Sequence, residues 1–192
     1  MPRIETETLA QHRDWRRSQL IDAAAAIALE SGGAAITVAA VAQRAGLSRT
    51  SVYEYFGSGA DLVADLVIDE LKTFASVLDE AVAACGDDAN RTECWISAAL
   101  TYIADGRHLL AKALNATALP QSRSQQIASA HRALMAPLIA GFEQMGVKDV
   151  QQAMAFVQAI TDVATKRIEA GNDAETEIKS ATAFCINGLA SL

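Results

Sequence analysis

Residues 35–58, with the sequence AITVAAVAQRAGLSRTSVYEYFGS, contain two helical patterns that are each too short to be stable alone. The first pattern covers residues 38–45 and the second runs from Ser48, its cap, to about Phe56, with Gly46 between them. Helices shorter than about 12–15 residues are marginal in water unless tertiary packing holds them. The stretch therefore requires a longer helix nearby, and it constrains this part of the chain to a small helical bundle.

The longer helix is predicted directly before this stretch, over residues 15–31. The glycine pair at 32–33 ends it, as glycine commonly does. Thr37 is the predicted N-cap of the second helix, and Ser48 is the predicted N-cap of the third. The apolar face of the long helix is formed by Leu20, Ala24, Ile27 and Ala28.

Helical patterns also dominate the rest of the chain, which has 51% hydrophobic residues, 11 glycines and 3 prolines. This composition is sufficient for a buried core and favours helix over sheet. Pro137 is expected to kink the helix that contains it. We predict an all-α fold whose later helices cover residues 60–84, 92–104, 107–116, 121–145, 149–170 and 174–192.

Composition also excludes several classes of protein. No apolar run approaches the roughly 18–20 residues of a membrane span, and the N-terminal MPRIETETLAQHRDW lacks the apolar segment of a signal peptide. We therefore expect a cytoplasmic protein with no membrane segment. The three cysteines are an odd number without a CxxC motif, which argues against a disulfide framework and a zinc site. Cys85 and Cys94 could form a redox switch, but we expect them to be thiols.

The charge is distributed unevenly along the chain. The net charge is -7, yet residues 1–57 hold six basic and six acidic residues, so the whole excess of acid lies in residues 58–192. A nucleic-acid binder usually presents a basic surface. Because residues 1–57 are electrically neutral and residues 58–192 are acidic, contact with DNA is compatible with the charge only through one face of the N-terminal part.

The exposed side of the third helix carries most of the hydrogen-bonding groups of this region. Packing through Val52 and Phe56 leaves the opposite side to Arg49, Thr50, Ser51, Tyr53 and Glu54. An arginine can donate two hydrogen bonds to guanine, a threonine or serine can reach base edges, and a tyrosine can donate to a phosphate. Two helices joined by a short turn with glycine form a helix-turn-helix motif, whose second helix enters the major groove of DNA.

The stretch ITVAAVAQRAGLSRTSVYEYFGSGADLVADL resembles the TetR family of bacterial transcriptional regulators, over about residues 15–71. The resemblance is carried by the threonine that opens the second helix, by AGLS at the turn, by YF at 55–56 and by the Asp61-Leu62 pair. It implies an all-α homodimer with an N-terminal three-helix DNA-binding head and a C-terminal helical ligand-binding and dimerisation domain. It also implies a regulator, usually a repressor, that releases a palindromic operator in double-stranded DNA when a small-molecule effector of unknown identity binds.

The same resemblance suggests domain boundaries and DNA contacts. We expect residues 1–14 to be a flexible arm, residues 15–59 the DNA-binding domain and residues 60–192 the ligand-binding and dimerisation domain. The lysine that usually opens the fourth helix and contacts a phosphate is replaced here by Gly59. DNA contacts are predicted at Thr37, Arg44, Ser48, Arg49, Thr50, Ser51, Tyr53 and Tyr55. Arg16 and Arg17 either contact a phosphate or are solvated charges.

The C-terminal part offers candidates for a ligand pocket, because aromatic and thioether side chains suit an adaptable apolar cavity. His131 lies on an apolar face, and we expect a hydrogen-bonded core residue there rather than a ligand contact. The candidate pocket residues are Trp95, Tyr102, His108, His131, Met135, Met154 and Phe156.

A two-fold dimer is predicted through the last two helices, where apolar residues recur at steps of three and four. The alternative is that both faces of these helices are wrapped in the core of a monomer. The predicted interface residues are Val150, Met154, Val157, Ile160, Ile168, Ile178, Ala181, Cys185 and Leu189.

No arrangement of catalytic residues and no pair of histidines at metal-ligand spacing is found, so we predict no enzymatic activity, no metal and no cofactor. The alternative function is a helical ligand-binding or interaction module with weak or lost operator binding. Gly59 and the net charge of -7 are the features that favour this alternative.

Overall fold

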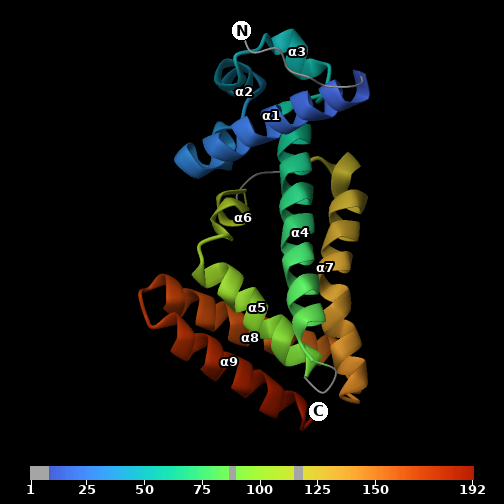
Figure 1. The fold of residues 1–192 in the computed structure, drawn as a ribbon, viewed down its shortest axis with the longest axis vertical. Helices are drawn as coiled ribbons and strands as arrows, with labels where there is room; N and C mark the ends of the chain where they lie inside the picture. The colour runs from blue at the N-terminus through green and yellow to red at the C-terminus, as the bar shows by residue number, and fades with distance from the viewer. Residues whose placement is uncertain (1–8, 87–89, 115–118) are drawn as a thin grey trace. The chain divides into compact units, whose positions relative to one another are not determined.

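The computed structural model describes residues 9–86, 90–114 and 119–192, and every regular element in these ranges is a helix. The predicted all-α fold is confirmed. The described residues form two compact units, one within residues 1–70 and 110–127 and the other within residues 71–109 and 128–192. Two long helices, α4 (Gly59–Ala84) and α7 (Ser124–Gln144), contribute residues to both units (Figure 1).

The first unit is built around three N-terminal helices. These are α1 (Leu9–Ser31), α2 (Val38–Ala45) and α3 (Arg49–Tyr53), with a short 3-10 turn, η1 (Gly33–Ala35), after α1. α1 packs against α2, and α2 packs against α3 (Figure 1). α6 (Leu109–Leu114) and η2 (Gln121–Arg123) also contribute to this unit. The centre of its core consists of the fully buried side chains of Leu20, Ala24, Val41, Val52 and Leu62.

Several helix boundaries differ from the predictions. α1 begins at Leu9 instead of residue 15, so residues 9–14 are helical, and residues 1–8 of the expected arm lie outside the described residues. α3 ends at Tyr53 instead of residue 56, although the N–H groups of Tyr55 and Phe56 still donate to the carbonyl oxygen of Val52. α6 is shorter than the predicted helix over 107–116, whose end lies outside the described residues.

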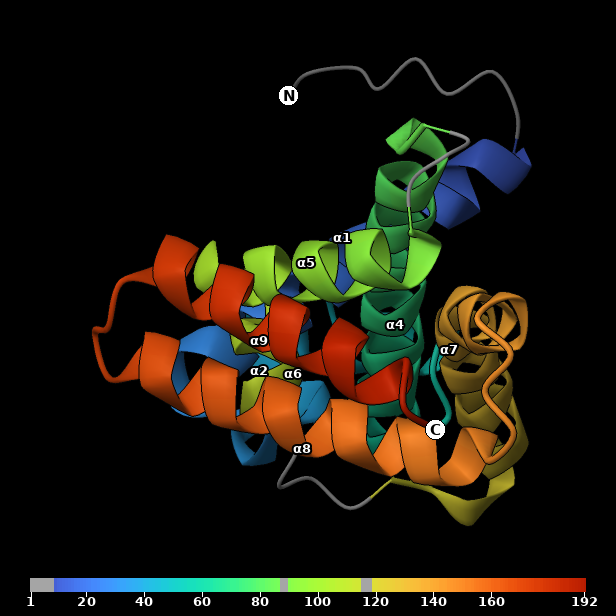
Figure 2. The ribbon, with the colours of Figure 1, turned by 90° about the horizontal axis from the view of Figure 1, so that it is seen from below.

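The second unit contains three neighbouring helices, which are α5 (Arg91–Ala104), α8 (Val150–Glu169) and α9 (Ala174–Leu189). α9 lies against both α5 and α8, and α5 also contacts α8 (Figure 2). Pro137 lies inside α7, which continues across it, and the expected kink stays a prediction. The most deeply buried side chains of this core are those of Leu78, Ile96, Leu100, Leu138 and Phe142.

The apolar stripe that was predicted to join two chains lies largely within the chain itself. Val157, Ala181, Cys185 and Leu189 are buried in the second core, while Val150, Met154, Ile160, Ile168 and Ile178 are half-buried. A stripe of this periodicity serves an internal core as well as an interface, so sequence could not separate the two. The exposed large apolar residues of α8 and α9 are Phe156, Val163 and Phe184.

Cys85 and Cys94 form a disulfide bond, which corrects the expectation that both are thiols. The bond joins the end of α4 to the first turn of α5. Sequence spacing could not reveal it, because the distance between the two sulfurs depends on how the chain passes from one helix to the next. Cys185 is a free thiol, and burial raises the pKa of that thiol to about 11, so it is protonated at neutral pH.

Gly141 of α7 faces Thr92 of α5 so closely that a Cβ atom on residue 141 would lie 2.3 Å from Thr92 Oγ1. Thr92 is completely buried. Gly141→Ala should therefore lower the free energy of unfolding by about 1–3 kcal/mol, because overpacking forces shifts in a close-packed core. Urea unfolding followed by circular dichroism measures the change.

The control is the same substitution in a Thr92→Ala background, where the clashing oxygen is absent. The cost of Gly141→Ala should be smaller there, since the two positions are coupled through that contact. Equal costs in the two backgrounds would contradict the packing described for these helices.

Candidate DNA-binding surface

Two hydroxyl side chains hold the first turns of the short helices in the head. Thr37 Oγ1 accepts a hydrogen bond from the N–H of Ala40 at 3.1 Å, and Ser48 Oγ accepts one from the N–H of Ser51 at 3.0 Å. Both predicted N-caps are therefore confirmed. Gly46 ends α2 with a φ of 67°, a left-handed conformation that glycine adopts without steric cost. These contacts fix the angle at which α3 leaves α2.

One side of α3 is exposed to solvent, as predicted. Arg49, Thr50 and Tyr53 are exposed, and the exposed fraction of Tyr53 is 58%. Arg49 forms no ion pair with any described residue, so its guanidinium is available to a ligand. Ser51 is half-buried beside Ser48, and Val52 on the opposite side is fully buried. α3 therefore presents a compact row of hydrogen-bonding groups from a fixed position.

Two other predicted DNA contacts already have partners within the head. Both terminal nitrogens of Arg44 donate to the carboxylate of Glu30, at 2.6 and 2.5 Å. The hydrogen bonds between the two side chains raise the pKa of Arg44 and lower the pKa of the Glu30 carboxyl. Tyr55 is half-buried, with the guanidinium of Arg13 5.9 Å from its ring centre. Arg44 and Tyr55 must leave these partners, at least in part, to reach DNA.

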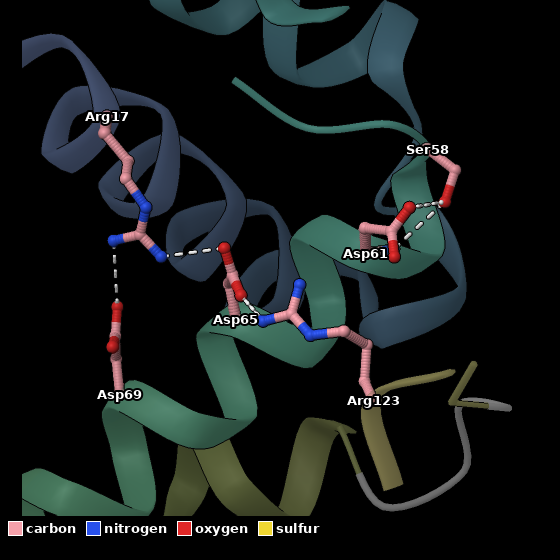
Figure 3. Close-up of polar contacts among 6 residues, drawn as sticks. All are labelled: Arg17, Ser58, Asp61, Asp65, Asp69 and Arg123. Carbon is pink, nitrogen blue, oxygen red and sulfur yellow. Dashed lines mark hydrogen bonds and ion pairs between the residues drawn. The ribbon is translucent and has the colours of Figure 1, made fainter. Parts of the chain in front are cut away.

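A network of ion pairs fastens α1 to α4 within the head (Figure 3). Arg17 of α1 donates to Asp65 of α4 at 2.7 Å and lies 3.6 Å from Asp69. Arg123 of η2 donates to the other oxygen of the same Asp65 carboxylate, which is only 13% exposed. Arg17 is thus paired with carboxylates of α4 and is not a free charge, although 39% of its side chain is exposed.

Sequence reasoning missed Asp65 and Arg123 because their partners lie far away along the chain. It also missed the cap of α4, where Ser58 Oγ accepts from the N–H of Asp61 at 3.1 Å and donates to the Asp61 carboxylate at 2.7 Å (Figure 3). The S-x-x-D pattern at residues 58–61 is the signal that could have revealed this cap.

Gly59 lies where α4 begins beside the backbone that leads into α2. A Cβ atom on residue 59 would lie 3.3 Å from the carbonyl oxygen of Ile36, which is closer than most such contacts. The glycine therefore permits a close approach of two backbone segments. It also leaves this position without a side chain that could contact a phosphate.

The residues predicted to line a ligand pocket differ widely in their exposure. Trp95 and Tyr102 are buried, Met135 and Met154 are half-buried, and Phe156 is 51% exposed. His108 is paired with Glu169, with Nε2 2.9 Å from the carboxylate. His131 is exposed, so its expected place in the core was wrong. The apolar face of a helix can extend beyond the helices that pack against it. The sequence does not show where those neighbouring helices end, so it does not show which residues of the face are exposed.

Two further findings concern the described part of the chain. None of its helices combines the length and the apolar character needed to cross a membrane. Its histidines, cysteines and carboxylates form no cluster of three or more that could hold a metal ion.

The fold and the surface together define a helix-turn-helix protein with a second helical unit. The two capped short helices, the glycine turn and the exposed side of α3 are the elements by which this motif contacts DNA. Residues 20–66 match the family model described as bacterial regulatory proteins, tetR family. The resemblance in the sequence is confirmed, and the head is a helix-turn-helix domain of the tetR family.

Solved structures share this fold over most of the chain. A protein from Pseudomonas aeruginosa PAO1, provisionally assigned as a transcriptional regulator, has a TM-score of 0.77 and 18% identity and covers 93% of this chain and 92% of its own. The transcriptional regulator FadR from Bacillus subtilis, in complex with stearoyl-CoA, has a TM-score of 0.71 and 20% identity, with coverages of 89% and 98%.

The superantigen pfit is as similar, with a TM-score of 0.71, 16% identity and 86% coverage of each chain. No curated protein matches the chain in sequence. Because the structural matches are so different in sequence, they establish the fold, and the residues of the head must carry the assignment of function.

Asp65→Asn should lower the free energy of unfolding by about 1–3 kcal/mol, because it leaves two arginines without their shared carboxylate. The expected loss is below that for a fully buried pair, since Arg17 is 39% exposed. Urea unfolding at neutral pH measures it. Glu30→Gln removes the exposed partner of Arg44 and serves as the control, with a much smaller expected effect. If the two variants lost equal stability, the network would not fasten α1 to α4.

Proposed function

We propose that this protein is a transcriptional regulator that binds an operator in double-stranded DNA as a homodimer and is controlled by a small molecule. The observation that carries the proposal is the row of exposed side chains on a rigidly capped α3, within a head that matches the tetR family over residues 20–66. The place of action is the cytoplasm, where bacterial DNA lies.

Each exposed residue of α3 has a role that follows from its position. The first residues of a recognition helix reach the base edges, so Arg49 and Thr50 read the sequence. Tyr53 lies one turn further along and donates to a phosphate, and Thr37 at the start of α2 contacts another phosphate. Ser48 acts through its cap, since its side-chain oxygen already accepts the Ser51 N–H. Ser51 is available only for a contact at the edge of this surface.

The dimer is proposed through the outer face of α8 and α9. Phe184 is 69% exposed there, and Phe156 and Val163 are each more than half exposed. Beside them lies a groove of about 360 Å³, lined by apolar side chains that include Phe156, Ile160 and Phe184. A second copy of the same face would cover these rings, as closed two-fold dimers do. Two heads would then read half-sites about one helical turn, ~34–36 Å, or a multiple of it apart.

The effector is proposed to bind in the second unit and to release the operator, which makes the protein a repressor. Trp95 Nε1 and Thr182 Oγ1 are buried polar atoms without a hydrogen-bond partner among the described residues. Most buried polar groups are hydrogen-bonded. A ligand that accepts a hydrogen bond from Trp95 Nε1 would supply the partner that this buried N–H lacks. Because FadR was solved with stearoyl-CoA, acyl-CoA is the first class of ligand to test. Binding is followed by the fluorescence of Trp95 in a Trp15→Phe variant, in which Trp95 is the remaining tryptophan.

A helical interaction module without an operator is the second candidate function. Gly59 favours it, because the head lacks the usual phosphate-contacting lysine at that position. Effector binding without any sequence-specific DNA binding would support this candidate over the first.

Arg49→Ala should weaken operator binding by about 1–3 kcal/mol and relax the preference at one base pair, because a two-pronged contact to guanine is lost. A band-shift titration with the DNA flanking the gene, repeated with single-base variants of the site, measures both effects. Arg132→Ala removes another exposed arginine, from α7, and should change neither. Unchanged affinity and unchanged base preference in Arg49→Ala would show that α3 does not read the groove.

Phe184→Glu should convert the dimer into folded monomers that bind the operator weakly, because a carboxylate cannot be buried unpaired at an interface. Sedimentation at micromolar concentration measures the mass, and circular dichroism confirms the fold. Leu109→Glu is the control, since Leu109 is 50% exposed on another helix. A monomeric parent protein, or a dimeric Phe184→Glu variant, would rule out this interface.

A further inference from the structure

The disulfide between Cys85 and Cys94 lies on an open groove rather than in the core. The groove has a volume of about 850 Å³ and is lined by both cysteines, by α4 through Val77 and Ala81, and by α5 through Ser97 and Thr101. Both cysteines are half-buried. A molecule in the groove therefore meets the disulfide directly, without unfolding the protein.

The third cysteine does not take part in this chemistry. Cys185 is 2% exposed, and the thiolate rather than the thiol is the nucleophile in disulfide exchange. Its burial also disfavours the thiolate. The pair at Cys85 and Cys94 can therefore open and close without scrambling to another partner in the chain.

We propose that Cys85–Cys94 is a reversible thiol–disulfide exchange site whose co-reactant is a small thiol that enters the groove. This site rests on the proposed function, because a DNA-binding regulator works in the reducing cytoplasm, where disulfides are usually transient, catalytic or redox-sensing. A structural role is disfavoured for the same reason, because the bond is open to attack by the thiols of that compartment.

The two sulfurs differ in how well each supports a negative charge. Cys94 lies in the first turn of α5, where the helix dipole favours a thiolate, while Cys85 follows the last residue of α4, where the dipole disfavours one. Glu93 opposes the effect at Cys94, but it is exposed and its charge is screened by solvent. Cys94 is therefore the better leaving group, and the incoming thiolate attacks Cys85.

The exchange then balances in two steps. A small thiolate attacks Cys85 Sγ, the Sγ–Sγ bond breaks, and its electron pair goes to Cys94, which takes up a proton. A second small thiolate attacks the sulfur of the first, which releases Cys85 as a thiol and leaves a small-molecule disulfide. Two electrons pass from the small thiols to the protein, and the tether between α4 and α5 opens. Glutathione disulfide reverses both steps.

The test counts thiols by alkylation with iodoacetamide in denaturant after acid quenching, followed by mass spectrometry. The full-length protein prepared without reductant should show one thiol, Cys185. After incubation of the folded protein in millimolar glutathione it should show three, and it should return to one in glutathione disulfide. A brief exposure should place the mixed disulfide on Cys85 in peptide maps.

The controls separate exchange from unfolding and from DNA binding. Cys185→Ser should show no thiol before glutathione and two afterwards, with circular dichroism unchanged. Failure of the reduced protein to return to one thiol in glutathione disulfide, or a disulfide that opens only in urea, would overturn the proposal. Band shifts with the oxidised and reduced forms are run in parallel: loss of operator binding in both forms would count against the proposed function and leave the exchange result standing.

Discussion

The head depends on the packing of α1, α2 and α3 around one shared core. Neither α2 nor α3 is long enough to be stable in isolation, so their structure is maintained by the shared core and by caps at their first turns. Leu20, Val41 and Val52 each lose all contact with water there, and burying one such side chain contributes about 1.5–3 kcal/mol. Everything that α3 presents to solvent is positioned by this packing, including Arg49.

The features that sequence could predict are those set by local rules. Thr37 and Ser48 were identified as caps because their hydroxyl groups stand directly before an apolar helical pattern, and the structure shows both accepting the expected backbone N–H. The exposed side of α3 followed from the burial of Val52 in the same way. These relationships join residues only a few positions apart, so they can be recognised in the sequence.

The features that sequence missed all depend on where distant segments meet. The pairing of Asp65 with Arg17 and Arg123 joins residues from three elements, and no spacing rule reveals it. The same is true of the Cys85–Cys94 bond and of the stripe on α8 and α9, whose buried side is the chain's own core. The burial of the candidate pocket residues depends on distant segments in the same way, since Trp95 is buried and Phe156 is exposed. His131, which was expected to be a core residue, is exposed as well.

The helix α4 connects the ion pairs that hold the DNA-binding head to the disulfide proposed as an exchange site. Near its start, Asp65 fastens it to α1 of the head, and directly after its end Cys85 ties the chain to α5. The Asp65 ion pairs and the disulfide therefore lie at opposite ends of the same helix. This arrangement makes α4 the element whose behaviour should be followed when the redox state or the effector changes.

The central claim is that α3 reads a DNA sequence. It is tested most directly by a competition titration in which unlabelled random DNA and unlabelled flanking DNA displace the labelled flanking site from the purified protein at physiological salt. The account predicts that the flanking DNA competes at least ~10³-fold better than random DNA, as specific binders do. Equal competition by the two DNAs would contradict it.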